Sequence, residues 1–226
     1  MDYATFELAP AERKDILRLV HIYFLAYLPD NLFRLRVSNL TEFEKGMTKI
    51  LENQVGKPTW RHVKVVNKKT GVLAAWASWN TPTDAQIRER DEKAAAKIAD
   101  SEEGKGKGEL DIFPAISNYV QADIDRWHGQ CTSGKRHMLC EALFTEPSFQ
   151  RQGMGSALVK YGSQLADQAN LLIFLQASAI GYPIYAKHGS ETDQYLDVDL
   201  REWVPGGKSN DKGYGNYRYR YMLRLP

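Results

Sequence analysis

Apolar residues recur at helical spacing in three stretches of this chain. Residues 11–28 place their apolar side chains on one face. A second helix is expected over 42–54, with Thr41 as its N-cap, because Glu44 follows three residues later as in a capping box. In the third stretch, 156–170, apolar residues again fall three and four positions apart. The pattern predicts three amphipathic helices.

Shorter apolar or alternating runs predict strands. Residues 60–67 and 72–79 are joined by Lys-Lys-Thr-Gly, a composition typical of a hairpin turn. The other expected strands are 137–145, 171–177, 195–200 and 217–225. The one at 171–177 is nearly all apolar, as an interior strand of a sheet must be. Helices and strands follow one another along the chain, which predicts an α/β fold.

The link from Asn80 to Lys135 is unusually long. Within it, 84–99 predicts a charged helix and 111–127 a helix with a better apolar face, with a polar segment at 101–108 between them. A long connection in a compact domain is often functional. We expect one domain over 1–226 with a helical insertion at about 80–135. The insertion would either lie beside the ligand site or decorate the far edge of the sheet.

A glycine-containing turn, Gln150 to Gly155, lies where a predicted strand gives way to a helix. The first amides of a helix have no intrahelical partner and carry partial positive charge. Gly153 and Gly155 have no Cβ, so a phosphate group can approach their backbone closely. The turn therefore suits a pyrophosphate-bearing cofactor, although the same spacing is also common in simple tight turns.

Composition narrows the functional classes. The net charge of +2 argues against a dedicated nucleic-acid surface. No apolar run approaches ~20 residues, so no membrane span is expected, and the first residues do not resemble a secretory signal. Cys131 and Cys140 do not make a disulfide framework, and with the histidines they show no metal-ligand spacing. A cytoplasmic protein without a metal is expected.

Three pieces of sequence together resemble the GCN5-related N-acetyltransferase (GNAT) superfamily. The first is Gln-x-x-Gly-x-Gly at 150–155, preceded by Pro147. The second is the apolar strand that ends at Ser178, and the third is 181–189, with Tyr185 at the tyrosine position of the family. The match covers about 137–190 and is similar to fungal-type members. The resemblance also implies a first strand near Phe6.

The resemblance implies a fold and a cofactor site. The fold is a mixed, largely antiparallel sheet whose central strands splay apart and admit the pantetheine arm of acetyl-CoA. The backbone of Leu143, Phe144 and Thr145 would pair with that arm, and Ser178 stands where many members carry asparagine. The pyrophosphate would be held by the turn and the start of the helix. The residues expected there are Gln150, Arg151, Gln152, Gly153, Met154, Gly155 and Ser156, and Tyr182 is expected near the cofactor.

The resemblance also suggests catalytic groups. Tyr185 is the candidate general acid, with Tyr182 as the alternative. Glu141 is the candidate base, because two-residue alternation places it on the face of Leu143 and Thr145. By the same alternation Cys140 faces away from the cofactor. A water chain, His137 or His128 would be alternative bases.

The expected function is direct transfer of acetyl from acetyl-CoA to a primary amine. Aromatic residues at Tyr23, Tyr27 and Phe33 favour a small-molecule acceptor, although aromatic residues at this spacing are usually part of a core. A protein or peptide acceptor is an alternative. A second alternative is an acyl-CoA-binding sensor or scaffold without catalysis, since fold alone does not prove activity. No nucleic-acid or membrane partner is expected, and the chain would be a monomer or a homodimer.

Overall fold

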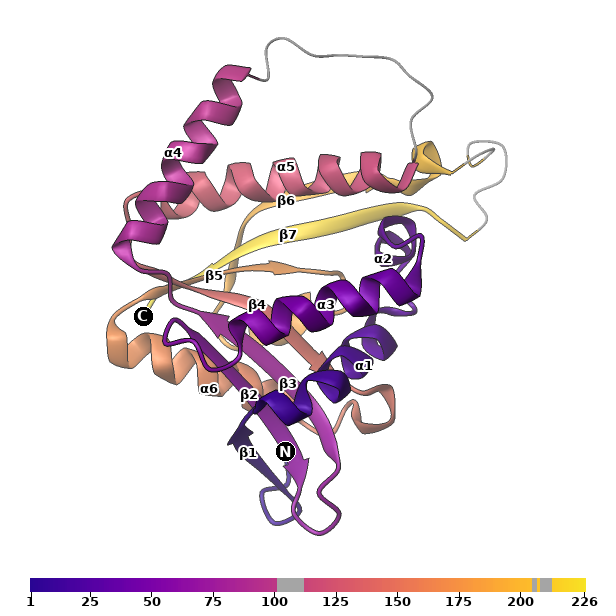
Figure 1. Ribbon diagram of the computed structural model, residues 1–226, viewed down its shortest axis with the longest axis vertical. Coiled ribbons are helices and arrows are strands. Elements are labelled where there is room, and N and C mark those ends of the chain that lie inside the picture. The colour runs from indigo at the N-terminus through magenta and orange to yellow at the C-terminus, as the bar shows by residue number, and fades with distance from the viewer. Residues whose placement is uncertain (101–111, 205–206, 208–212) are drawn as a thin grey trace.

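A seven-stranded sheet forms the centre of the computed structural model, which describes residues 1–100, 112–204, 207 and 213–226 (Figure 1). The strand order is β1-β2-β3-β4-β5-β7-β6, and all neighbours are antiparallel except β4 and β5. The strands are β1 (Phe6–Pro10), β2 (Trp60–Asn67), β3 (Leu73–Asn80), β4 (His137–Thr145), β5 (Leu172–Ala177), β6 (Glu191–Asp199) and β7 (Asn216–Arg224). The predicted mixed, largely antiparallel α/β fold is confirmed.

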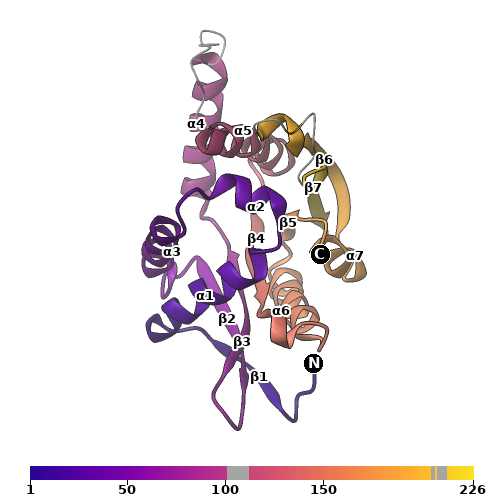
Figure 2. The ribbon, with the colours of Figure 1, turned by 90° about the vertical axis from the view of Figure 1, so that its right-hand side faces the viewer.

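Helices cover both faces of the sheet (Figure 2). They are α1 (Ile16–Tyr27), α2 (Asn31–Arg36), α3 (Leu40–Gln54), α4 (Asp84–Asp100), α5 (Ile112–Thr132), α6 (Met154–Ala169) and α7 (Tyr182–Lys187). Helix α6 packs over a core that includes Trp79, whereas α1 packs over Trp76 and Phe144 on the opposite face. Helix α5 lies against Phe174 and Tyr221. Among the described residues, no helix is long and apolar enough to cross a bilayer.

Helix α6 approaches the sheet very closely at Gly162. A Cβ added at this residue would lie 2.2 Å from Cζ2 of Trp79, whose side chain is 1% exposed. Only a residue without a side chain allows this distance. The contact fixes α6, and with it the turn that begins the helix, against β3.

The two central parallel strands separate at Glu141. Strand β4 pairs with β5 only as far as Cys140, which lies opposite Leu175. On its other edge, β4 pairs with β3, but the register slips: Trp79 is opposite Cys140 and Ser78 is opposite Ala142. Glu141 is therefore the extra residue of a β-bulge, which bends a strand and ends its regular pairing. From Leu143 to Thr145 one edge of β4 is not paired with β5.

The bulge also corrects the predicted alternation. Cys140 and Leu143 both pack in the core under α6, while Leu139 and Phe144 belong to clusters on the opposite face. The prediction that Cys140 faces away from Leu143 was wrong. The extra residue inserts one step into a two-residue repeat, so every side chain beyond it changes face.

Several helix boundaries differ from the prediction: α1 begins at Ile16 rather than at 11, and α5 continues to Thr132 rather than ending at 127. Helix α3 begins at Leu40, and its N-cap is Asn39, whose side chain accepts a hydrogen bond from the Glu42 amide at 3.1 Å, rather than Thr41. The short helix α2 was not predicted. Its N-cap is Asp30, which accepts from the amide of Phe33 at 2.9 Å.

The insertion between β3 and β4 contains the two expected helices, α4 and α5. They contact each other, and Arg90 of α4 bonds Nε2 of His128 and the hydroxyl of Thr132 on α5 at 2.7 and 2.9 Å. Helix α5 runs along the sheet over β5 and β7, as Figure 1 shows. The predicted polar segment at 101–108 lies outside the described residues.

Candidate functional site

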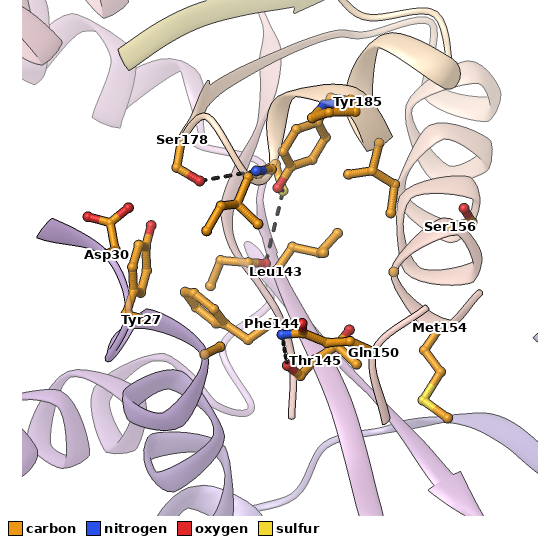
Figure 3. Close-up of a pocket in the computed structure, with 18 of the residues that line it drawn as sticks. Tyr27, Asp30, Leu143, Phe144, Thr145, Gln150, Met154, Ser156, Ser178 and Tyr185 are labelled. Carbon is orange, nitrogen blue, oxygen red and sulfur yellow. Dashed lines mark hydrogen bonds between the residues drawn. The ribbon is translucent and has the colours of Figure 1, made fainter. Parts of the chain in front are cut away.

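A cavity of about 600 Å³ opens where β4 and β5 separate (Figure 3). This volume is typical of small-molecule sites. Of the residues predicted from the sequence, the cavity is lined by Glu141, Leu143, Phe144, Thr145, Gln150, Arg151, Gly153, Met154, Gly155, Ser156, Ser178 and Tyr185. The structure thus brings together residues from β4, the glycine turn, the end of β5 and α7.

Two predicted residues do not line this cavity. Gln152 is exposed, and its side-chain amide donates to the carbonyl of Ser148 at 3.4 Å. Tyr182 lies under the guanidinium of Arg220, 4.2 Å from Cζ to the ring centre. Tyr182 therefore packs against β7 rather than toward the cavity.

The glycine turn has the backbone conformation that an anion site requires. Gly153 is the N-cap of α6 and has φ of 80°, a value that L-residues rarely adopt. Arg151 also has positive φ, 62°, and its side chain lines the cavity. The amide of Ala157 donates to the Gly153 carbonyl at 3.0 Å, so the preceding amides of α6 have no intrahelical acceptor. This is the arrangement that binds phosphate at helix N-termini.

The second half of β4 offers an unpaired backbone edge to the cavity. Leu143, Phe144 and Thr145 pair with Ala77, Trp76 and Ala75 of β3 on one side. On the other side β5 has diverged. An extended ligand with amide groups could therefore add to this edge as a strand does. The pantetheine arm of CoA has that chemistry, so these residues fit the expected cofactor.

Tyr185 lines the cavity and is 7% exposed (Figure 3). Helix α7 is held at its start by Ser178, whose hydroxyl accepts from the Gly181 amide at 3.1 Å. Burial, and secondarily the neighbouring Cys140, raises the pKa of Tyr185 well above its ordinary value. The phenol therefore stays protonated and can act as a proton donor.

Cys140 was not among the predicted site residues, yet it lines the cavity beside Tyr185. The Sγ of Cys140 and the hydroxyl oxygen of Tyr185 are 3.8 Å apart. Burial raises the pKa of the Cys140 thiol to about 12, with the Tyr185 hydrogen bond opposing this rise. A neutral thiol is a poor nucleophile. No local sequence signal distinguishes this cysteine, because its orientation depends on the bulge.

Glu141 protrudes from the bulge into the cavity. Its side chain keeps a water-accessible surface, but the surrounding protein desolvates the carboxylate and raises the pKa of Glu141, while a hydrogen bond with Asn80 lowers it. A raised carboxyl pKa is the property of a general base that works near neutral pH. Glu141 also lines a smaller cavity of about 230 Å³ next to α5.

The two histidines considered as alternative bases form a separate cluster. Nε2 of His128 lies 3.1 Å from Nε2 of His137, and Arg90 contacts both rings. Burial, with Arg90 next in importance, lowers the pKa of His128 to about 3. Neither histidine lines the main cavity. The cluster connects α4, α5 and β4, and His128 also lines the smaller cavity.

A further carboxylate, Asp30, lines the cavity and was not predicted. Its side chain is 7% exposed. One oxygen accepts from the Phe33 amide at 2.9 Å, and the other accepts from the Tyr217 hydroxyl at 2.7 Å. In the sequence, Asp30 after Pro29 resembles only the end of a helix. The contact with Tyr217 spans 187 positions, so no local pattern reveals it.

The aromatic residues expected near an acceptor mostly belong to the core. Tyr23 and Phe33 pack with each other and with Phe43, and Tyr23 also packs on Phe144 with 4.4 Å between ring centres. Tyr27 alone of the three predicted residues lines the cavity. Among the described residues, no group of three or more His, Cys, Asp or Glu side chains is arranged to hold a metal ion.

Comparison with known proteins identifies the fold. No protein-family model matches the chain, and no curated protein matches it. Among solved structures, the chain is similar to the polyamine N-acetyltransferase of Drosophila melanogaster, an enzyme that forms N-acetylagmatine. The TM-score is 0.62 at 12% identity, and the comparison covers 98% of this chain and 100% of that chain. An acetyltransferase from Corynebacterium glutamicum, described as related to histone acetyltransferase, gives a TM-score of 0.59, 14% identity, and coverage of 98% and 97%.

A third similar structure is the C-terminal condensation domain of Ebony in complex with beta-alanyl-dopamine. It gives a TM-score of 0.66, 10% identity, and coverage of 98% and 99%. All three comparisons extend over nearly the whole chain. The chain therefore has the fold of the N-acetyltransferases.

Proposed function

We propose that this protein is a GNAT enzyme that transfers an acetyl group from acetyl-CoA directly to a primary amine, most simply that of a small molecule. The observation that carries the proposal is the separation of β4 from β5 at the Glu141 bulge. The cavity that results lies between the glycine turn and Tyr185. A turn suited to phosphate, an open strand edge and a buried phenol thus line one cavity, which supports the proposal.

In this proposal the donor lies along β4. The pyrophosphate binds the free amides at the start of α6, and Arg151 and Lys187, which line the cavity, add positive charge. The pantetheine arm pairs with the backbone of Leu143 to Thr145. The thioester then reaches the bulge, where the strand backbone turns away from β5 and an amide can stabilise negative charge on the carbonyl oxygen.

The transfer requires three proton movements: two protons leave the nitrogen and one reaches the thiolate. Glu141 accepts a proton from the acceptor ammonium, directly or through water, and frees the nitrogen lone pair. The nitrogen attacks the thioester carbon, the C–N bond forms, and the C–S bond breaks. Tyr185 donates its proton to the departing thiolate. The nitrogen loses its second proton as the amide forms, and this proton restores Tyr185 through water, while Glu141 returns the first proton to solvent. Burial disfavours a tyrosinate, but it also disfavours an unprotonated thiolate beside it, so the donation remains feasible.

The insertion contributes to the acceptor side. Gln121, Asp125 and His128 of α5 line the smaller cavity, which shares Cys140, Glu141 and Gln176 with the main one. An acceptor whose nitrogen reaches Glu141 would therefore approach α5. This supports a role for the insertion in the choice of substrate. A fungal-type origin, a cytoplasmic location and a monomeric or dimeric state stay predictions.

The experiment separates an enzyme from a sensor. Binding of CoA and acetyl-CoA is measured by calorimetry, and free thiol release is then measured with primary amines and with peptides. An enzyme of this kind binds the cofactor and releases thiol only when an acceptor is present. Tight binding with no thiol release for any acceptor would instead favour the acyl-CoA-binding sensor. Release with peptides alone would favour a protein acceptor.

A further inference from the structure

Two tyrosines of β7 each hold a buried carboxylate, and the two pairs differ in one respect. Tyr221 donates to Asp123 at 2.6 Å, and Tyr217 donates to Asp30 at 2.7 Å. Asp123 also forms an ion pair with Arg126. Among the described residues, the Asp30 side chain forms no ion pair, and its two hydrogen-bond donors, the Tyr217 hydroxyl and the Phe33 amide, are both neutral.

The unpaired carboxylate lies in the wall of the main cavity. Asp30 and Tyr27 lie side by side across the cavity from Tyr185 (Figure 3). Both donors point at the Asp30 oxygens, so each oxygen accepts one hydrogen bond. A buried carboxylate is costly unless a cation or several donors compensate it. Within the described part of the chain, Arg126 supplies a cation at Asp123, and no cation is paired with Asp30.

A second acidic group faces the same space. Glu141 lines the cavity, and so does Tyr219 of β7. Burial is the main cause that raises the pKa of the Tyr219 phenol. Tyr23, Asp30 and Glu141 raise this pKa further, which means that both carboxylates lie close to Tyr219. Arg36 of α2 acts on Tyr219 in the opposite direction but forms no ion pair with Asp30. The faces of Tyr27 and Tyr219 are surfaces on which a cation can also rest.

We infer that Asp30 is the anionic subsite for a second cationic group of the acceptor, so that the preferred substrates carry two positively charged nitrogens. The inference rests on the proposed acetyl transfer. One nitrogen lies at Glu141 and is acetylated, and the other is bound by Asp30 between Tyr27 and Tyr219. Asp30 would then have two roles: it caps the N-terminus of α2, and it determines which acceptors are preferred.

A matched pair of acceptors tests this inference. Linear aliphatic diamines of several lengths are compared with monoamines in which a methyl group replaces one amino group. The wild-type protein is expected to favour the best diamine over its monoamine by about 10- to 100-fold in kcat/KM, as for one charge-assisted hydrogen bond. Asp30→Asn removes the charge but keeps a side chain that caps α2, and the ratio should fall to near one.

The control is Asp123→Asn, which removes the carboxylate of the second tyrosine pair outside the cavity and should leave the ratio unchanged. Thermal unfolding shows whether both variants are folded. A wild-type ratio near one, or a ratio that survives Asp30→Asn, overturns the subsite while acetylation itself stands. If no amine is acetylated, the proposed function fails. In that case the subsite is tested by binding. Calorimetry measures the affinity of the same diamines and monoamines for the wild-type and Asp30→Asn proteins in the presence of CoA, and a preference for diamines that Asp30→Asn removes would support the subsite.

Discussion

The hydroxyl of Tyr185 lies 3.8 Å from the sulfur of Cys140, on the face of the sheet that carries α6. A thiol is a weak hydrogen-bond partner, so it does not hold the phenol proton as a carboxylate or carbonyl would. The hydroxyl is thus placed at the cavity wall but remains available to a stronger acceptor. A thiolate that forms in the cavity would be such an acceptor.

Tyr185→Phe is expected to lower kcat by about 10²- to 10⁴-fold, which is typical for loss of a general acid. Binding of CoA should change little, because the ring still fills its place in the core. The matched control is Tyr182→Phe, one helical turn earlier and packed under Arg220. Steady-state kinetics of both variants checks the prediction. Equal effects of the two changes would argue that Tyr185 only packs.

Glu141→Gln is expected to remove the acidic limb of the pH profile as well as to slow turnover. A base must be deprotonated to accept a proton, so activity falls as pH falls through its pKa. Desolvation raises the pKa of Glu141 above that of an ordinary glutamate, and the limb should therefore lie above pH ~4.3. The measurement is kcat/KM against pH for both proteins with one acceptor.

The exposed Glu42→Gln is the control for Glu141→Gln, since it removes a carboxylate far from the cavity. A full rate and an unchanged acidic limb in Glu141→Gln would transfer the role of base to a water chain.

Gly153→Ala is expected to weaken CoA binding by about tenfold or more. The left-handed φ of 80° strains an alanine by about 1–2 kcal/mol, and its Cβ would lie 2.2 Å from the backbone nitrogen of Met1, so the turn must shift. Gly134→Ala carries similar strain in an exposed turn, with φ of 65° and nothing within 4 Å of the added Cβ. Calorimetry with 3′-phosphoadenosine diphosphate and with pantetheine localises the effect. A loss confined to pantetheine would contradict the assignment of the turn.

Gly162→Ala tests the packing that positions α6. The added methyl group would meet the buried ring of Trp79 at 2.2 Å, and overpacking of this kind costs about 1–3 kcal/mol of the free energy of unfolding. Gly46→Ala, inside α3 and with nothing within 4 Å, should instead stabilise by about 0.5–1 kcal/mol. Urea unfolding midpoints measure both. A neutral Gly162→Ala would mean that α6 moves away from Trp79 at little cost.

Periodic patterns made most of the elements predictable. The helices α1, α3 and α6 and the strands β2 and β4 were expected from spacing alone, because each buries one face or lies wholly inside the core. The glycine turn was also recognisable, since a strand and a helix flank it. The α/β class therefore followed from local patterns and from the order of the elements, whereas the mixed, largely antiparallel sheet was expected from the family resemblance.

The functional geometry depends on features that have no local pattern. The bulge adds one residue to β4, and nothing in the sequence marks Glu141 as that residue, so the facing of Cys140 was predicted wrongly. Asp30 becomes part of the site only through Tyr217, which lies near the other end of the chain. Tyr182 shares its helix with Tyr185, but the turn of α7 directs it to Arg220 instead.

The central claim is direct acetyl transfer in the cavity between β4 and β5. Its most direct test is mass spectrometry of primary amines, linear diamines included, after incubation with acetyl-CoA and the protein, with released CoA measured in the same samples. Acetylated amine and free CoA are expected in equal amounts, and Tyr185→Phe should strongly reduce both. Normal binding of acetyl-CoA with no acetylated product from any acceptor would contradict it.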